Sequence, residues 1–332
     1  MTQLPRVSVF SLGGTIAMSG DTGQGANLAL DADDLVRQIP SLDQWAEVKS
    51  QAFLSKTSSN ITFDDLIKLA SHIRRDFADG VDGVVVIQGT DAMEETAFVL
   101  DLLLGDVGPV AVTGAMRTAE AVGAEGPANI LSAIIAVSSP QMQKSATGVV
   151  LVANDDVHAA RFVTKSHTAK TSTFTSPECG PIGLVSEGRL YLYTVPAHRP
   201  VFDFTSLENV PDVALVVSAF DDDGRMIGCV EQAGYKAAVL EAFGAGHLSH
   251  AAARAAEHLA KNMIVLVASR AGAGPVFTRT YGYEGAEVDL HQRGLLLAGA
   301  LGARKARVLL ALLLAGGASK AEVETAFLQF KA

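Results

Sequence analysis

At 332 residues the chain is long enough for two domains of ordinary size, each with its own hydrophobic core. Its 48% hydrophobic and 19% charged residues describe a folded globular protein rather than a disordered one. The 36 acidic residues outnumber the 26 basic ones and leave a net charge of −10, which argues against nucleic acid or an anionic membrane as a partner, since both attract clustered positive charge. We therefore expect a small-molecule or protein partner.

Cysteine usage and hydropathy indicate the compartment. Cys179 and Cys229 lie far apart and match no zinc or redox spacing, so a reducing cytoplasm is the expected location. The longest apolar runs, at 295–303 and 308–315, fall short of the ~20 residues that a membrane helix needs. The chain begins without a basic stretch followed by an apolar one, so no signal peptide is visible.

The first half of the chain alternates strands and helices. A buried strand at 7–12 ends in Gly13-Gly14, and an aperiodic, glycine-rich segment at 18–27 is expected to be a mobile loop. Thr62 and Asp65 have the spacing of a capping box and open a helix with one apolar face. The further elements expected here are a helix at 31–39, a helix at 63–77, a strand at 84–87, a helix ending near 104, a strand at 109–113, a helix at 127–137 and a strand at 148–153.

The alternation lapses between 192 and 211, where three prolines interrupt the chain, and then restarts. The elements expected after it are strands at 213–217, 237–243 and 263–268, a helix at 248–260 and two closing helices, the last entered through a capping box at Ser319 and Glu322. Such alternation indicates parallel sheets covered by helices on both faces. We predict an α/β protein with a larger, mainly parallel, doubly wound (flavodoxin-like) domain at 1–192, a linker at 193–211, and a smaller Rossmann-like domain at 212–332.

One stretch, Val84–Thr96, combines a strand end with polar side chains. An apolar run delivers Gly89, Thr90 and Asp91, and acidic residues then open a helix. In open α/β sheets ligands collect at that end of a strand, facing a helix N-terminus. Thr15 follows the strand at 7–12 in a similar setting. Taken alone, each threonine is more often a cap or a turn residue.

Nucleotide and metal sites are poorly supported. Gly13-Gly14 and the segment at 244–246 each lack part of the G-x-G-x-x-G spacing of a dinucleotide turn. His247 and His250 are three residues apart, but histidines at a helix start are usually solvated, so we expect no metal.

Lys165 follows the strand at 148–153, in a strand-to-loop position. A hydroxyl is a poor nucleophile until a base takes its proton, so a catalytic threonine needs a partner. A lysine serves as that base only where burial or a neighbour lowers its pKa. A threonine, lysine and aspartate set meets the need, with the lysine as base and the aspartate holding it. On the sequence alone, a surface lysine remains the simpler interpretation.

Two motifs carry a family resemblance. Leu12–Ala17 together with Gly89–Thr96 resembles the paired signature of the bacterial-type L-asparaginase (asparaginase/glutaminase) family. The similarity continues in one colinear order over essentially the whole chain, through Gly114–Arg117, Glu125–Asn129, Val163–Lys165, Ala286–Asp289 and Lys305–Leu310.

The resemblance implies an amidohydrolase that converts L-asparagine to L-aspartate and ammonia without a cofactor. It implies that Thr15 is the nucleophile, on a flexible loop that closes over substrate. Thr90, Lys165 and Asp91 match a second triad that activates a hydroxyl or water at the same amide, and Asp91 also binds the substrate α-ammonium. L-Glutamine is then a weaker substrate, since one extra methylene costs only ~1–3 kcal/mol of discrimination.

The resemblance also implies binding residues from other parts of the chain. Ser58 matches a ligand of the α-carboxylate, with the turn residue before the following helix as its simpler interpretation, and Ser59 stands where the family has a glutamine. Glu287 matches an acidic residue that the family lends from the C-terminal domain of a neighbouring subunit. His247 stands at the position of a family asparagine. A shared site implies a homodimer, commonly paired into a tetramer.

The chain also departs from the family pattern. Leu28 stands where the family usually has a tyrosine that assists the nucleophile, and Gln88 replaces a common histidine. We hypothesise that Tyr281 or Tyr283 brings a phenol into the site from the partner subunit. The alternatives that remain open are an amidase for another small amide, and an amino-acid-binding or sensor protein in which Leu28 marks lost catalysis.

Overall fold

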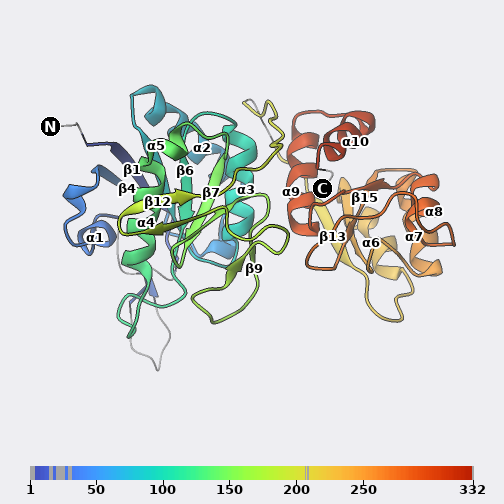
Figure 1. The fold of residues 1–332 in the computed structure, drawn as a ribbon. Helices are drawn as coiled ribbons and strands as arrows, with labels where there is room; N and C mark the ends of the chain where they lie inside the picture. Colours follow the sequence, from blue (N-terminus) through green and yellow to red (C-terminus); the bar gives the residue numbers. More distant parts are fainter. Residues whose placement is uncertain are drawn as a thin grey trace. The chain divides into compact units, whose positions relative to one another are not determined.

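The computed structural model describes residues 4–14, 18–19, 27–28, 32–205, 207 and 209–330. The chain forms two compact units, Met1–Asp203 and Phe204–Ala332 (Figure 1). Thr15 and most of the glycine-rich segment at 18–27 lie outside the described residues, except for β2 (Met18–Ser19) and β3 (Asn27–Leu28), which pair antiparallel.

The N-terminal unit is built on an eight-stranded sheet in the order β12-β11-β8-β7-β6-β5-β1-β4. Its strands are β1 (Arg6–Ser11), β4 (Glu47–Ala52), β5 (Gly83–Ile87), β6 (Val110–Thr113), β7 (Val149–Ala153), β8 (Asp156–Ala159), β11 (Gly183–Ser186) and β12 (Arg189–Leu192). The run from β4 through β1, β5 and β6 to β7 is parallel, which confirms the predicted mainly parallel α/β fold.

Helices cover both faces of this sheet (Figure 1). They are α1 (Ala32–Arg37), α2 (Phe63–Ala78), α3 (Met93–Leu104), α4 (Gly126–Ser138) and the short α5 (Pro140–Gln143). Helices α1, α4 and α5 lie on one face, and α2 and α3 on the other. The capping box at Thr62 and Asp65 is present with both of its hydrogen bonds, and it starts α2 where the sequence predicted a helix start.

Two tight hairpins extend the sheet antiparallel beyond β7, which the sequence analysis did not anticipate. Asn154 and Asp155 join β7 to β8 with φ angles of 54° and 64°, and Glu187 and Gly188 join β11 to β12 with φ angles of 50° and 71°. Two central residues with positive φ form the two-residue turn whose twist matches that of the strands it connects. A further short ladder pairs β9 (Thr164–Lys165) with β10 (Phe174–Thr175).

The order of the parallel strands locates the point where the chain changes direction across the sheet. If the five parallel strands are numbered along the chain, their order across the sheet is 2-1-3-4-5. The switch point therefore lies between β1 and β5, where ligands bind in doubly wound sheets. Gly14 follows β1 with a φ of +101°, and a Cβ built on it would lie 2.0 Å from the Gly89 backbone nitrogen. The two glycines that precede Thr15 and Thr90 are therefore packed against each other, and only glycine fits at Gly14.

Part of the stretch expected to be a linker is attached to the N-terminal unit. The Arg199 guanidinium is buried and binds Asp101 at 3.0 Å and Asp106 at 2.6 Å. It also donates to the carbonyl oxygens of Asp101 and Gly105. Burial raises the pKa of Asp101, and Arg199 opposes that effect.

The C-terminal unit is a smaller α/β body with a four-stranded parallel sheet in the order β13-β14-β15-β16. Its elements are β13 (Val213–Val217), α6 (Arg225–Gln232), β14 (Ala237–Ala242), α7 (His250–Ala260), β15 (Ile264–Ser269), α8 (Glu287–Gln292), β16 (Leu296–Leu297), α9 (Ala303–Ala315) and α10 (Lys320–Leu328). Helices α6 and α7 pack beside each other, and α9 packs against β13, β14 and β15. The predicted capping box at Ser319 and Glu322 starts α10.

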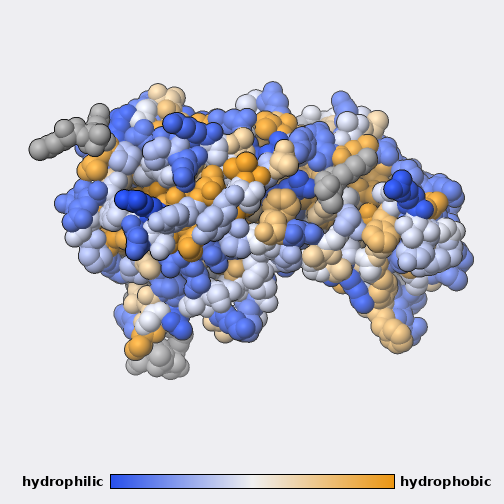
Figure 2. Space-filling model, in the orientation of Figure 1, coloured by the Kyte–Doolittle hydropathy of each residue, from blue (hydrophilic) through white to orange (hydrophobic). Residues whose placement is uncertain are grey.

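Large apolar clusters lie inside each unit, whereas the face in Figure 2 intersperses hydrophilic residues with smaller hydrophobic groups. Cys179 and Cys229 are both free and exposed, and they belong to different units. Within the described part of the chain, none of the helices combines the length and the apolarity that crossing a bilayer requires.

Candidate active site

The turn between β5 and α3 places a hydroxyl beside a carboxylate, as the sequence analysis expected. Thr90 is buried, whereas the Asp91 side chain is 77% exposed, so the turn presents one polar group inside and one outside. Three valines and an isoleucine drive β5 into the core, and the turn follows directly at the carboxyl end of the strand. The two side chains therefore sit at the switch point of the sheet, beside the N-terminus of α3.

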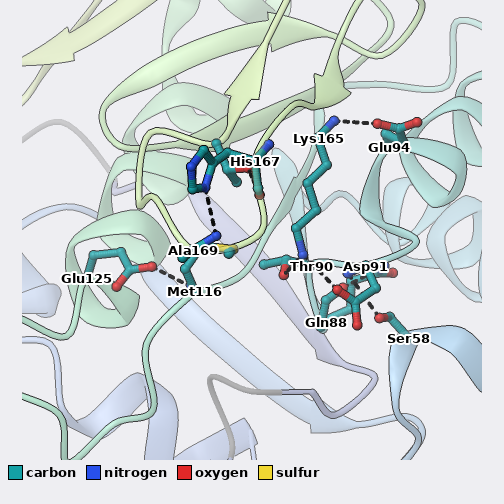
Figure 3. Close-up of polar contacts among 12 residues, drawn as sticks. Ser58, Gln88, Thr90, Asp91, Glu94, Met116, Glu125, Lys165, His167 and Ala169 are labelled. Atoms are coloured by element: carbon teal, nitrogen blue, oxygen red, sulfur yellow. Dashed lines mark hydrogen bonds and ion pairs between the residues drawn. The ribbon is translucent and has the colours of Figure 1, made fainter.

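Lys165 is 75 residues further along the chain, and β9 brings it to the same point (Figure 3). Its Nζ donates a hydrogen bond to Thr90 Oγ1 at 2.8 Å and forms an ion pair with Asp91 Oδ1 at 2.7 Å. The lysine side chain is only 16% exposed, so Lys165 is not the surface residue of the simpler interpretation. Threonine, lysine and aspartate thus form one hydrogen-bonded set.

This set has the parts needed to move a proton. The lysine nitrogen lies within hydrogen-bond distance of the threonine oxygen. When its amine is neutral, it can therefore accept the proton of that hydroxyl. The Asp91 carboxylate contacts the lysine nitrogen directly and holds it beside Thr90. The same carboxylate is open to solvent on its other side, where it can meet a cation.

Ser58 belongs to the same site through the backbone. It lies in a 3₁₀ turn, Ser58–Asn60, that follows β4, and its buried Oγ accepts a hydrogen bond from the Asp91 backbone N–H at 3.2 Å. The hydroxyl hydrogen of Ser58 is left to donate elsewhere. Ser59 is exposed, and its Oγ lies 3.3 Å from Thr57 Oγ1.

An ion pair anchors the segment that carries Ser58. Lys56 Nζ binds Asp65 Oδ2 at 2.6 Å and thereby joins the segment to the first turn of α2. Burial alone would raise the pKa of Asp65, but the hydrogen bonds from Lys56 and Thr62 outweigh it, and the pKa lies below its usual value. The capping box that starts α2 and the position of Ser58 thus depend on one carboxylate.

The structure assigns contacts to three motif residues that the sequence analysis left without a role. Glu94 Oε2 accepts a hydrogen bond from the Lys165 backbone N–H, and Glu125 Oε1 accepts one from that of Met116 (Figure 3). Asn129 donates to the Gly114 carbonyl at 2.9 Å and accepts from the Asn154 N–H at 2.8 Å. Glu94 and Asn129 are buried in the structure. In the sequence, the available signal was a polar residue near the start of a mainly apolar helix.

A second polar cluster lies in the C-terminal unit. The Tyr283 hydroxyl lies 3.0 Å from His247 Nδ1, and His247 Nε2 lies 3.1 Å from Glu287 Oε2. The other carboxylate oxygen of Glu287 accepts the backbone N–H groups of Thr280 and Tyr281 at 2.8 and 2.7 Å. These residues form a chain from an exposed phenol through an imidazole to a fully buried carboxylate.

The charge on Glu287 is set by its hydrogen bonds. Burial would raise the pKa of Glu287, but the backbone N–H groups and His247 outweigh that effect and hold the pKa below its usual value. A charged Glu287 that accepts from His247 Nε2 leaves Nδ1 to accept the Tyr283 proton. Tyr281 contributes its backbone N–H and an edge-to-face ring contact to His247, with centroids 5.2 Å apart.

Comparison with known proteins places both units in one family. Residues 6–198 match the family model "Asparaginase, N-terminal", and residues 212–327 match "Glutaminase/Asparaginase C-terminal domain". The chain therefore belongs to the asparaginase family, as its motifs indicated.

Individual relatives agree over nearly the full length. L-asparaginase 2 of Bacillus subtilis is 32% identical, with 94% of this chain and 83% of that protein covered. L-asparaginase 2 of Escherichia coli is 31% identical, with coverage of 98% and 94%. The crystal structure of a probable cytoplasmic L-asparaginase from Campylobacter jejuni superposes with a TM-score of 0.87 at 31% identity and covers 98% of this chain and 99% of its own.

Proposed function

We propose that this protein is an L-asparaginase, an amidohydrolase that converts L-asparagine to L-aspartate and ammonia. The observation that carries the proposal is the hydrogen-bonded set of Thr90, Lys165 and Asp91 at the switch point of the sheet. Membership of the asparaginase family and the names of the similar proteins support it. The C-terminal family description also supports L-glutamine as a second substrate, and we propose that it is the weaker one because of its extra methylene.

The reaction proceeds in two steps at one amide carbon. Thr15, which directly follows Gly14, attacks the amide carbonyl, and the leaving ammonia takes up the proton that the hydroxyl releases. Water, activated at Thr90 by the neutral amine of Lys165, then hydrolyses the resulting ester and frees Thr15. Backbone N–H groups at the start of α3 stabilise the oxyanion in both steps.

The polar groups around the turn fit an amino acid rather than a simple amide. The exposed side of Asp91 binds the α-ammonium, and the hydroxyl of Ser58 donates to the α-carboxylate. Glu287 adds negative charge from the C-terminal unit of a neighbouring subunit, with His247 as its hydrogen-bond partner. This arrangement requires a homodimer, and we propose a dimer of dimers. We also propose a cytoplasmic location, as described for the similar Campylobacter jejuni protein.

Ammonia release from L-asparagine tests the proposal. Thr90→Val and Lys165→Met should each lower kcat by about 10²–10⁴-fold, because each removes a proton-transfer partner. Thr113→Val is the matched control: Thr113 is also a buried strand-end threonine, but its hydroxyl donates to the Val152 carbonyl at 2.7 Å. We expect that control to keep kcat within about threefold. A wild-type protein that binds L-asparagine tightly without releasing ammonia would contradict the proposal.

A further inference from the structure

Residues 90–94 contact Lys165 at both its side-chain nitrogen and its backbone N–H. The ammonium group binds Thr90 and Asp91 in the turn before α3, and the backbone N–H of the same lysine donates to Glu94 in the first turn of that helix (Figure 3). Glu94 is buried, so its carboxylate lies inside the unit and not at the surface where Asp91 is open. The helix N-terminus stabilises a negative charge in that first turn.

The strand that carries Lys165 is short, and its pairing leaves one side of the lysine backbone facing α3. Strand β9 has two residues, and its ladder with β10 is equally short. Ser166, the next residue, directs its N–H to the Thr173 carbonyl on the β10 side at 2.8 Å. Successive N–H groups of an extended chain point to opposite sides, so the Lys165 N–H faces away from β10. Glu94 is the acceptor on that side, and without it this backbone N–H would lose its hydrogen bond inside the unit.

From this geometry we propose that Glu94 is a positioning residue for Lys165, setting the distance between the lysine amine and the Thr90 hydroxyl. A hydrogen bond to an ionised carboxylate is shorter and stronger than a neutral one, so it defines the place of the lysine backbone closely. The side chain then reaches Thr90 from a fixed origin. The inference rests on the proposed amide hydrolysis and adds a residue that acts on the reaction through its bond to the backbone of Lys165.

Kinetics of three variants test this role. Glu94→Leu should lower kcat about 10–100-fold with KM changed less than about threefold, because misplacement of a catalytic group by about 1 Å can cost that much while Ser58 and Asp91 stay in place. Glu94→Gln retains an acceptor oxygen and should restore kcat to within about fivefold of wild type. In the Lys165→Met background, Glu94→Leu should cause almost no further loss, since residues that act as a unit are not additive.

Glu125 provides the matched control, because it makes the same kind of bond to the Met116 N–H instead. Glu125→Leu should lose as much activity in the Lys165→Met background as in wild type. If Glu94→Leu behaves in this additive way too, or keeps kcat within threefold while folded, the proposed role is wrong.

Two measurements without substrate separate this inference from the proposed function. Hydrogen exchange at the Lys165 amide should accelerate at least tenfold in Glu94→Leu and remain near the wild-type rate in Glu125→Leu. Acylation of Lys165 Nζ by acetic anhydride, followed by mass spectrometry, should be faster in Glu94→Leu than in Glu125→Leu. Unchanged exchange and unchanged labelling would overturn the inference even in an active enzyme, and both results can be read in a protein that hydrolyses no amide.

Discussion

Tyr283 and Tyr281 are two residues apart, yet they meet His247 in different ways. Tyr283 places its hydroxyl at the imidazole, whereas Tyr281 offers its ring. A phenol whose proton can pass to an imidazole backed by a buried carboxylate is suited to proton transfer, as the hydroxyl of a serine triad is. Of the two tyrosines that the sequence suggested as substitutes for the one replaced by Leu28, the hydrogen bonding favours Tyr283.

Two phenylalanine variants distinguish these tyrosines. Tyr283→Phe should lower kcat for L-asparagine about 10–100-fold by removing the proton that faces His247. Tyr281→Phe keeps the ring contact and the backbone N–H to Glu287, so its kcat should stay within about threefold of wild type. Steady-state ammonia release measures both. Full kcat in both variants would show that neither phenol takes part.

At the scale of elements, strand β8 carries a buried titratable group that the proposed chemistry does not use. His158 is buried, its Nδ1 lies 2.9 Å from Ser176 Oγ, and its Nε2 has no hydrogen-bond partner among the residues that the structure describes. Burial lowers the pKa of His158 to about 4. The folded protein thus keeps the ring neutral at pH values where the unfolded chain, with a pKa near 6.5, already binds a proton.

This pKa difference predicts an acid-sensitive N-terminal unit. The unfolded state gains a proton as the pH falls below about 6.5, so the free energy of unfolding should decrease by about 2–3 kcal/mol between pH 7 and pH 4.5 through His158 alone. The loss should level off below the folded pKa. In His158→Gln that share of the pH dependence should disappear, while the shares of other groups remain.

Urea denaturation followed by tryptophan fluorescence can measure this difference. Trp45 is the single tryptophan of the chain and lies in the same unit as His158, so its emission reports unfolding of the relevant body. The quantity to compare is the change in unfolding free energy from pH 7 to pH 4.5 in wild type and in the variant. Equal changes in the two proteins would rule out His158 as the source.

At the scale of the whole molecule, local patterns in the sequence predicted most of the parallel part of the fold. Apolar runs and capping boxes revealed β1, β5, β6, β7 and the helices between them, because strand burial and helix caps depend on neighbouring residues. Strands β8, β11 and β12 were missed, since each is four residues long and their pairing depends on positive φ angles at turns without an Asn-Gly signal. The parallel edge strand β4 was missed for another reason: it is half-exposed and mostly polar, so it has no apolar run.

The site was only partly predictable for the same reason. Thr90 and Asp91 stand out because a buried strand leads directly into them. Lys165 reaches them through a two-residue ladder, and Ser58 through a single bond to the backbone of Asp91. Such contacts between distant parts of the chain leave no periodic pattern in the sequence, so family resemblance rather than periodicity pointed to these two residues.

The proposed sharing of a site between subunits leads to a prediction that no single variant can test. If each site combines Thr90 of one subunit with Glu287 of its neighbour, Thr90→Val and Glu287→Gln homodimers should both be poorly active. A mixed dimer of the two variants would carry both changes in one site and neither in the other. Unfolding and refolding the variants together should therefore restore activity, approaching half of the wild-type value per mixed dimer.

The control for this experiment shows whether activity returns because an intact site forms across two subunits or for some other reason. Thr90→Val refolded with Lys165→Met should recover nothing, because the proposed site takes both residues from one subunit and every site then carries a defect. If the two variants carry different affinity tags, the mixed dimers can be purified away from the homodimers. Activity can then be expressed per mixed dimer. Recovery in the Lys165→Met pair, or none in the Glu287→Gln pair, would show that the residues are not divided between subunits in the proposed way.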